Sequence, residues 1–376
     1  MDGRLSAPAF IIGGPGWTVD ALFLPPVMDA SALRRRLFHW SIGSLAALAL
    51  PLINSNPYQL DVLTTSLLYA LLALGLNLIV GLTGVLHLGY AAFFAIGAYT
   101  YGLLNLHAHC PFWLGWVPAA AIAGIFGVCL GLPALRVRGD YLAIVTLGFG
   151  EIVRIAVTNL EPWTGGPNGL TGISHPVIWT PSGAFDFGVS STPYYYLACV
   201  TVIVVAAVCV RLSRSRIGRA WKAIREDELA ASCSGVPVLH LKLLAQGCGG
   251  AIAGIAGAIF AAKQGTITPD SFDFVLSVMV LAMVVLGGLG SIRGTIVGAL
   301  LLGSLPELLR GFEQYRMLVF GLSMIMVMRL RPQGLFGQFQ RSTPGLLRSR
   351  RGTDSKPDDG SAALSAQPPY PSKLET

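Results

Sequence analysis

The chain is a succession of long apolar stretches separated by charged or turn-forming residues. A helix needs about 20 apolar residues to cross a hydrocarbon core of about 30 Å. About ten stretches approach that length: 37–52, 58–82, 85–106, 112–132, 141–160, 194–210, 241–262, 272–289, 295–309 and 317–328. The pattern predicts an all-α, polytopic bundle of about ten transmembrane helices. The stretch 85–106 contains or adjoins Gly84, Gly89, Gly97 and Gly102, so it could instead be a broken or re-entrant helix.

The positions of lysine and arginine predict the orientation of these spans, because cytoplasmic loops carry the excess of positive charge. Three arginines at 34–36 precede the first stretch, and the loop 161–192 contains no lysine or arginine. Counting crossings from 34–36 places the basic cluster 211–242 on the same side as the N-terminus. Ten spans with both termini in the cytoplasm fit this alternation.

Composition supports a membrane protein and argues against several classes of enzyme. Of 376 residues, 53% are hydrophobic and 12% are charged, whereas soluble domains carry about 25% charged residues. The six cysteines form no CxxC pair, and no P-loop, HExxH, GxSxG or dinucleotide-binding motif occurs. We therefore expect a transport subunit that binds no metal or cofactor of its own and has no disulfide framework.

Ionisable residues are rare within the apolar stretches. Glu151 and Arg154 lie three residues apart on one helix face, and Asp61 and Glu307 lie near predicted span ends. The intramembrane pair of Glu151 and Arg154 is interpreted as a mutually neutralising structural pair, with a role in the transport pathway as the alternative. No proton relay for a gradient-driven carrier is evident.

Three regions follow from this reading of the chain. Residues 1–33 form an N-terminal cytoplasmic segment without the pattern of a signal peptide. Residues 34–335 form the transmembrane permease domain, and residues 336–376 form a cytoplasmic tail whose Ser, Pro, Arg and Asp content predicts disorder.

The loop at about 212–240 has the pattern of an amphipathic helix. Its apolar positions are Trp221, Ile224 and Leu229, opposite alternating charges. A helix lying in solvent or on the membrane surface would have this pattern. However, the loop also resembles the coupling loop of ABC importer permeases, which docks into a groove on the ATPase, although a leucine is inserted into its Glu-Ala-Ala sequence. The residues that the resemblance assigns to ATPase coupling are Trp221, Arg225, Glu226, Asp227, Glu228, Ala230, Ala231 and Gly235.

Four further segments resemble the branched-chain amino-acid ABC permease family, more narrowly its M-type subunit, and the resemblance spans about 60–335. They are GLTGVLHLGYAAFFAIGAY, RVRGDYLAIVTLGFGEIVRI, TGGPNGLTGI and MVVLGGLGSIRGTIVGA. The resemblance implies a permease of the branched-chain amino-acid and ribose-like class. Its implied partners are a related H-type permease, two cytoplasmic ATPases that use ATP and magnesium, and a periplasmic binding protein. Implied substrates are branched-chain amino acids; urea or short amides, or a gradient-driven carrier, are the alternatives.

The family motifs also suggest which residues would contact a substrate and a binding protein. Tyr90, Phe93 and Thr146 are candidate pathway residues by motif position, although core packing explains each equally well. The predicted external turn could contact the binding protein or be a plain connector. It consists of Gly165, Gly166, Pro167, Asn168 and Gly169.

Overall fold

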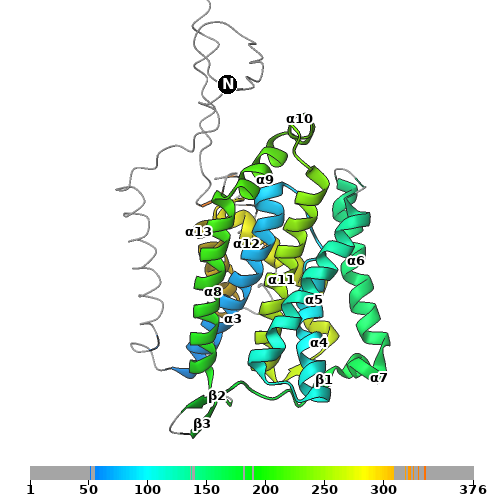
Figure 1. Cartoon of the computed structure of the whole chain (residues 1–376). Coiled ribbons are helices and arrows are strands. Elements are labelled where there is room, and N and C mark those ends of the chain that lie inside the picture. The colour runs from blue at the N-terminus through cyan, green and yellow to red at the C-terminus, as the bar shows by residue number, and fades with distance from the viewer. Residues whose placement is uncertain are drawn as a thin grey trace, which may run out of the picture. The chain divides into compact units, whose positions relative to one another are not determined.

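The computed structural model describes residues 56–135, 137, 140–180, 183–188 and 190–308, together with the isolated positions 51, 318, 321, 322, 325, 329, 334 and 335. The predicted spans 37–52 and 317–328 therefore fall almost wholly outside the described residues, as do the segment 1–33 and nearly all of 336–376. Within the described part, the chain folds into packed helices that run between two ends (Figure 1).

Helices occupy the apolar stretches that the sequence marks. They are α3 Pro57–Leu76, α4 Ala91–Ala108, α5 Phe112–Ala134, α6 Asp140–Asn159, α8 Ser191–Arg214, α11 Val238–Gln264, α12 Phe274–Gly287 and α13 Ile292–Leu308. Six segments of the described chain are long and apolar enough to cross a membrane: Pro57–Leu82, Phe112–Ala134, Tyr141–Asn159, Ser191–Arg214, Val238–Gln264 and Pro269–Gly287. The chain is thus mostly helical and multi-pass, whereas the count of ten stays a prediction.

The predicted span at 85–106 is a broken one. Helix α3 continues into the π-helix η1, Asn77–Leu82, and α4 begins only at Ala91. Between them, residues 84–90 are not helical. A non-helical backbone among spans is tolerated where protein atoms satisfy its polar groups, as the Thr146 hydroxyl does for the Leu88 N–H.

Helix α11 lies at the centre of the bundle and packs against α3, α4 and α5. Small residues allow α11 and α5 to approach each other closely. A methyl group at Gly254 would lie 2.6 Å from the carbonyl oxygen of Ala119, and one at Gly127 would lie 2.6 Å from that of Gln246. Gly287, Gly294 and Gly298 meet in the same way between α12 and α13. Glycines at these positions let the helices approach closely in lipid.

Different structures cover the two ends of the bundle (Figure 1). One end carries α9 Arg216–Glu226 and α10 Glu228–Cys233. The other carries α7 Glu161–Thr164, the 3₁₀ turns η2 Gly166–Asn168 and η3 Pro269–Phe272, and four short strands. Strand β1 Leu170–Thr171 pairs antiparallel with β4 Thr266–Ile267, and β2 Val177–Thr180 with β3 Gly183–Asp186. The described chain is mostly helical, as the sequence predicts. The two small ladders lie in connectors, where water can satisfy edge groups.

Candidate functional site

The loop at the α9–α10 end is built by local sequence signals. Ser215 caps α9 by accepting a hydrogen bond from the Gly218 N–H (3.2 Å). The backbone turns at Asp227, and the Asp227 carboxylate caps α10 through the Ala230 N–H (3.0 Å). Gly235, at φ +81°, lies just after α10, where a left-handed residue favours glycine. The single amphipathic helix of the sequence reading is thus two short helices with a bend.

The apolar residues of this loop differ in how deeply they are buried. Trp221 and Ile224 are 0% and 3% exposed, and the Trp221 Nε1–H donates to the Leu241 carbonyl (2.8 Å). Leu229, on α10, is 74% exposed. Trp221 and Ile224 therefore anchor α9 to its own bundle, whereas Leu229 is left open. A role of these residues in ATPase coupling stays a prediction.

Charged residues tie the loop to the membrane helices. The Glu228 carboxylate pairs with the Lys242 ammonium on α11 (2.6 Å). The Arg225 guanidinium donates to the Gly81 carbonyl (2.6 Å), and the Arg225 side chain packs against Gly84. Arg225 thus points toward the bundle. Of the remaining coupling residues, Glu226, Asp227 and Ala230 are exposed and Ala231 is buried.

Two breaks in the helices meet beneath Arg225. Gly81 closes the π-helix η1, and Gly290 lies in the turn between α12 and α13. The Asn77 side-chain oxygen accepts a hydrogen bond from the Gly290 N–H (2.8 Å). A methyl group at Gly290 would lie 3.0 Å from the Gly81 carbonyl oxygen and 3.1 Å from Arg225 Nη1. One arginine of the loop therefore contacts both breaks.

The candidate pathway residues surround the non-helical segment and hold it. The Thr146 hydroxyl accepts from the Leu88 N–H (3.0 Å), and the Tyr90 hydroxyl donates to the Gly249 carbonyl (2.8 Å). The Phe93 ring lies edge-on to that of Tyr90 at 5.9 Å. All three side chains are buried. The structure brings them together, and substrate contact by any of them stays a prediction.

The glycines of the predicted external turn are required by its backbone. Gly165, Gly166 and Gly169 all have positive φ, and a methyl group on Gly169 would overlap the Ile267 carbonyl. These glycines let the chain turn into the β1–β4 ladder. Pro167 and Asn168 are exposed, so they are the part of this turn open to another protein.

The Glu151 and Arg154 pair forms, with a third member that sequence reasoning missed. Arg154 Nε lies 3.0 Å from Glu151 Oε2, and Arg154 Nη1 lies 3.7 Å from Asp270 Oδ1. Asp270 belongs to η3, which is 116 positions away in the chain, so spacing gave no signal. At the same end, Asp61 on α3 pairs with Lys263 on α11 (2.8 Å).

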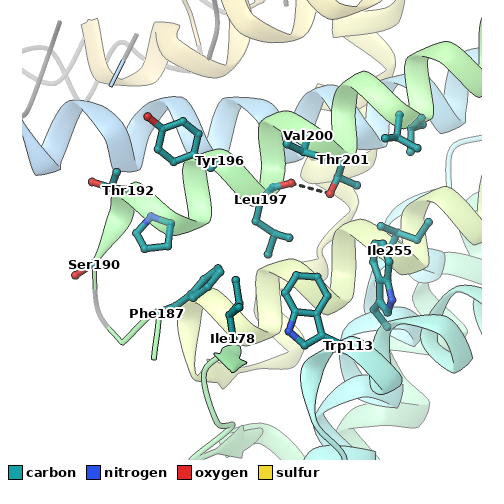
Figure 2. A pocket seen from close by; sticks show the side chains of 14 residues that line it. Trp113, Ile178, Phe187, Ser190, Thr192, Tyr196, Leu197, Val200, Thr201 and Ile255 are labelled. Atoms are coloured by element: carbon teal, nitrogen blue, oxygen red, sulfur yellow. Dashed lines mark hydrogen bonds between the residues drawn. The ribbon is translucent and has the colours of Figure 1, made fainter. Parts of the chain in front are cut away.

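An apolar groove of about 740 Å³ opens beside α8 (Figure 2). Residues of α8, α11, the start of α5 and the β2–β3 hairpin line it, among them Trp113, Phe187, Leu197 and Ile255. The Thr201 hydroxyl is turned to the Leu197 carbonyl of its own helix (2.7 Å). With almost no free polar group, the groove suits hydrocarbon and offers nothing to a charged solute.

Comparisons with known proteins agree on one family. A family described as "Branched-chain amino acid transport system / permease component" matches residues 58–328. The chain is 43% identical over 331 residues to the high-affinity branched-chain amino acid transport system permease protein LivM of Salmonella typhimurium, covering 83% of this chain and 77% of that protein. Escherichia coli LivM gives the same identity and coverage. LivH of Escherichia coli is 26% identical over 72% of this chain and 91% of its own length. No solved structure matches.

Proposed function

Because the chain belongs to the branched-chain amino acid transport permease family, we propose that it forms, with an H-type partner permease, the membrane conduit of an ABC importer for branched-chain amino acids. The chain is a permease and not an enzyme. In this proposal, two cytoplasmic ATPases supply ATP hydrolysis, a periplasmic binding protein delivers the amino acid, and the complex lies in a bacterial inner membrane.

The α9–α10 loop carries the proposal. Leu229, whose side chain is 74% exposed, lies on the short helix α10. This helix follows α9, which Trp221 anchors to the bundle, and the Glu228–Lys242 pair ties it to α11. Such a rigidly mounted apolar residue suits insertion into a groove of a partner protein. The exposed Glu226 and Asp227 beside it would orient the contact, since charge complementarity fixes register more than it adds affinity.

A second feature supports coupling to the membrane helices. The guanidinium of Arg225, an exposed residue of α9, donates to the carbonyl of Gly81, which lies next to the α12–α13 turn. A displacement of α9 by an ATPase would therefore act directly on the two helix breaks. Helix breaks are the places where a transporter bends without losing hydrogen bonds in the helix interior.

The test is to weaken the proposed docking contact without disturbing the fold. Leu229→Asp should weaken ATPase docking by about 2 kcal/mol, or about 30-fold, because a buried leucine contributes about that much. Copurification of the ATPases and leucine uptake in proteoliposomes should both fall, while Leu229→Met should keep both. Retention of ATPase binding and uptake by Leu229→Asp would contradict the assignment.

The same preparation separates ATP-driven import from a gradient-driven carrier. Leucine uptake by the parental complex should stop when ATP is withdrawn and should persist when an uncoupler dissipates the proton gradient. The reverse result would contradict ATP coupling altogether.

A further inference from the structure

A narrow cleft lies between α4, α6 and the turn η3, beside the Glu151–Arg154–Asp270 cluster. Its walls are mostly aliphatic or aromatic, with Ala92, Val153, Val157 and Phe272 among them, and Arg154 and Tyr99 are its polar members. Glu151 and Asp270 do not line the cleft, but both lie beside it in contact with Arg154. The cleft therefore combines a hydrocarbon wall with one cation, and two carboxylates adjoin it.

The charges are divided between two separate elements. Arg154 and Glu151 stand on α6, about a third exposed each, whereas the Asp270 side chain is 89% exposed on η3. The 3.7 Å separation of Arg154 from Asp270 is longer than a good charge-assisted hydrogen bond of about 2.8 Å. One cation faces two carboxylates, so the cluster has an uncompensated negative charge and an arginine that is incompletely engaged.

Tyr99 supplies an independent sign of a missing partner. Its side chain is 4% exposed, its ring is tilted at 57° to that of Phe272 with the ring centroids 5.9 Å apart, and its hydroxyl has no hydrogen-bond partner among the described residues. Leaving a buried hydroxyl unpaired costs about 1–3 kcal/mol. Other buried tyrosines nearby avoid this cost: the Tyr90 hydroxyl bonds Gly249 and that of Tyr101 bonds Ser174.

We propose that this cleft is a transient binding site for the head group of an amino-acid zwitterion on its way through the permease. The substrate carboxylate is bound by the Arg154 guanidinium and the Tyr99 hydroxyl, and its ammonium by Glu151 and Asp270. Its aliphatic side chain lies against Val153, Val157 and Phe272. This inference rests on the proposed function, because it names the groups by which the permease itself would recognise that substrate.

The cleft has no room for a water molecule in this structure, so in this proposal a ligand enters only when α6 separates from α4 and η3. Only 22% of the membrane-spanning window of α6 is buried, against 61% for α11. Moving α6 therefore breaks fewer internal contacts than moving the central helix, and the longer Arg154–Asp270 pair is the link that opens.

Photolabelling tests the location directly. The complete transporter, in lipid nanodiscs, is irradiated with a leucine analogue that carries a diazirine in its side chain. Label should appear in α6 near Val153 and Val157 and at Phe272. Excess leucine should suppress it, whereas N-acetyl-leucine and leucinamide, which each lack one charge, should not. Labelling confined to other helices would overturn the proposal.

Variants separate a binding role from a structural ion pair. Tyr99→Phe removes only the unpartnered hydroxyl and should lower leucine uptake about three- to tenfold, as expected for one hydrogen bond. The matched control Tyr141→Phe, at an exposed position of α6, should leave uptake unchanged. The double variant Glu151→Gln with Arg154→Gln removes both charges of the pair, so it should assemble normally and lose uptake by more than about 30-fold.

The outcomes distinguish this inference from the proposed function. If the parental transporter imports leucine and the double variant does so at the parental rate, the pair is structural and the site assignment fails while the function stands. If the parental transporter imports no branched-chain amino acid, both fail together.

Discussion

At the scale of single residues, Arg225 connects the α9–α10 loop to the membrane helices. It is the second-last residue of α9, its guanidinium bonds a main-chain carbonyl of η1, and it touches the glycine of the α12–α13 turn. The resemblance assigned Arg225 to ATPase coupling. Although the residue is exposed, its guanidinium bonds to the bundle, which fits a link between the loop and the spans.

Replacing Arg225 tests that link. Arg225→Met keeps an unbranched stem against Gly84 but removes the charged hydrogen bond to Gly81, which contributes about 1.5–3 kcal/mol. We expect ATPases to remain bound and ATP to be hydrolysed while leucine uptake falls at least about tenfold. Lys222→Met, at an exposed position of the same helix, is the matched control. Loss of ATPase binding in Arg225→Met alone would instead indicate a direct interface contact.

At the scale of elements, small residues decide which helices can touch. Gly254 faces α5, where the Ala119 carbonyl and the Ala123 side chain leave no room for a side chain. Gly148 on α6 has no atom within 4 Å of the place where a methyl group would be. The two glycines are alike in the sequence, and only their surroundings separate them.

This contrast predicts opposite effects of the same substitution. Gly254→Ala should destabilise the bundle by about 1–3 kcal/mol through overpacking of the α5–α11 seam. Gly148→Ala should leave stability unchanged or slightly raise it, since alanine favours helix more than glycine. Thermal unfolding of the purified protein in detergent measures both. Equal Tm values for the two variants would contradict the packing argument.

At the scale of the whole molecule, the ends of the bundle differ in charge as well as in structure. The segment 211–242, which contains α9 and α10, is rich in arginine and lysine, and the connector 161–192 has neither. The positive-inside rule therefore predicts that the α9–α10 end faces the cytoplasm, which the coupling proposal requires.

Cysteine labelling checks this orientation. Cys233 on α10 is exposed, so in a protein whose other five cysteines are replaced it should react with a membrane-impermeant maleimide only in inverted vesicles. A cysteine placed at Asn168, in a background without Cys233, should react only in intact spheroplasts. Labelling of Cys233 from the outside would remove any possibility of contact with an ATPase.

The sequence by itself determined that lipid surrounds this chain, where the described helices lie, and to which family the chain belongs. Long apolar stretches must become helices in hydrocarbon because every backbone group needs a partner there. The sequence also marked the Glu151–Arg154 pair, because residues three apart share a helix face. These inferences depend only on neighbours along the chain.

Tertiary structure decided the rest, because it depends on contacts between residues that are far apart in sequence. Periodicity placed Trp221, Ile224 and Leu229 on one apolar face, but only packing against α11 buries the first two and leaves Leu229 open. Likewise, no spacing joins Asp270 and Tyr99 to α6, or Arg225 to Gly81. Those pairings exist because helices that are distant in the chain approach each other closely. They can do so because glycine and alanine residues line their shared surfaces.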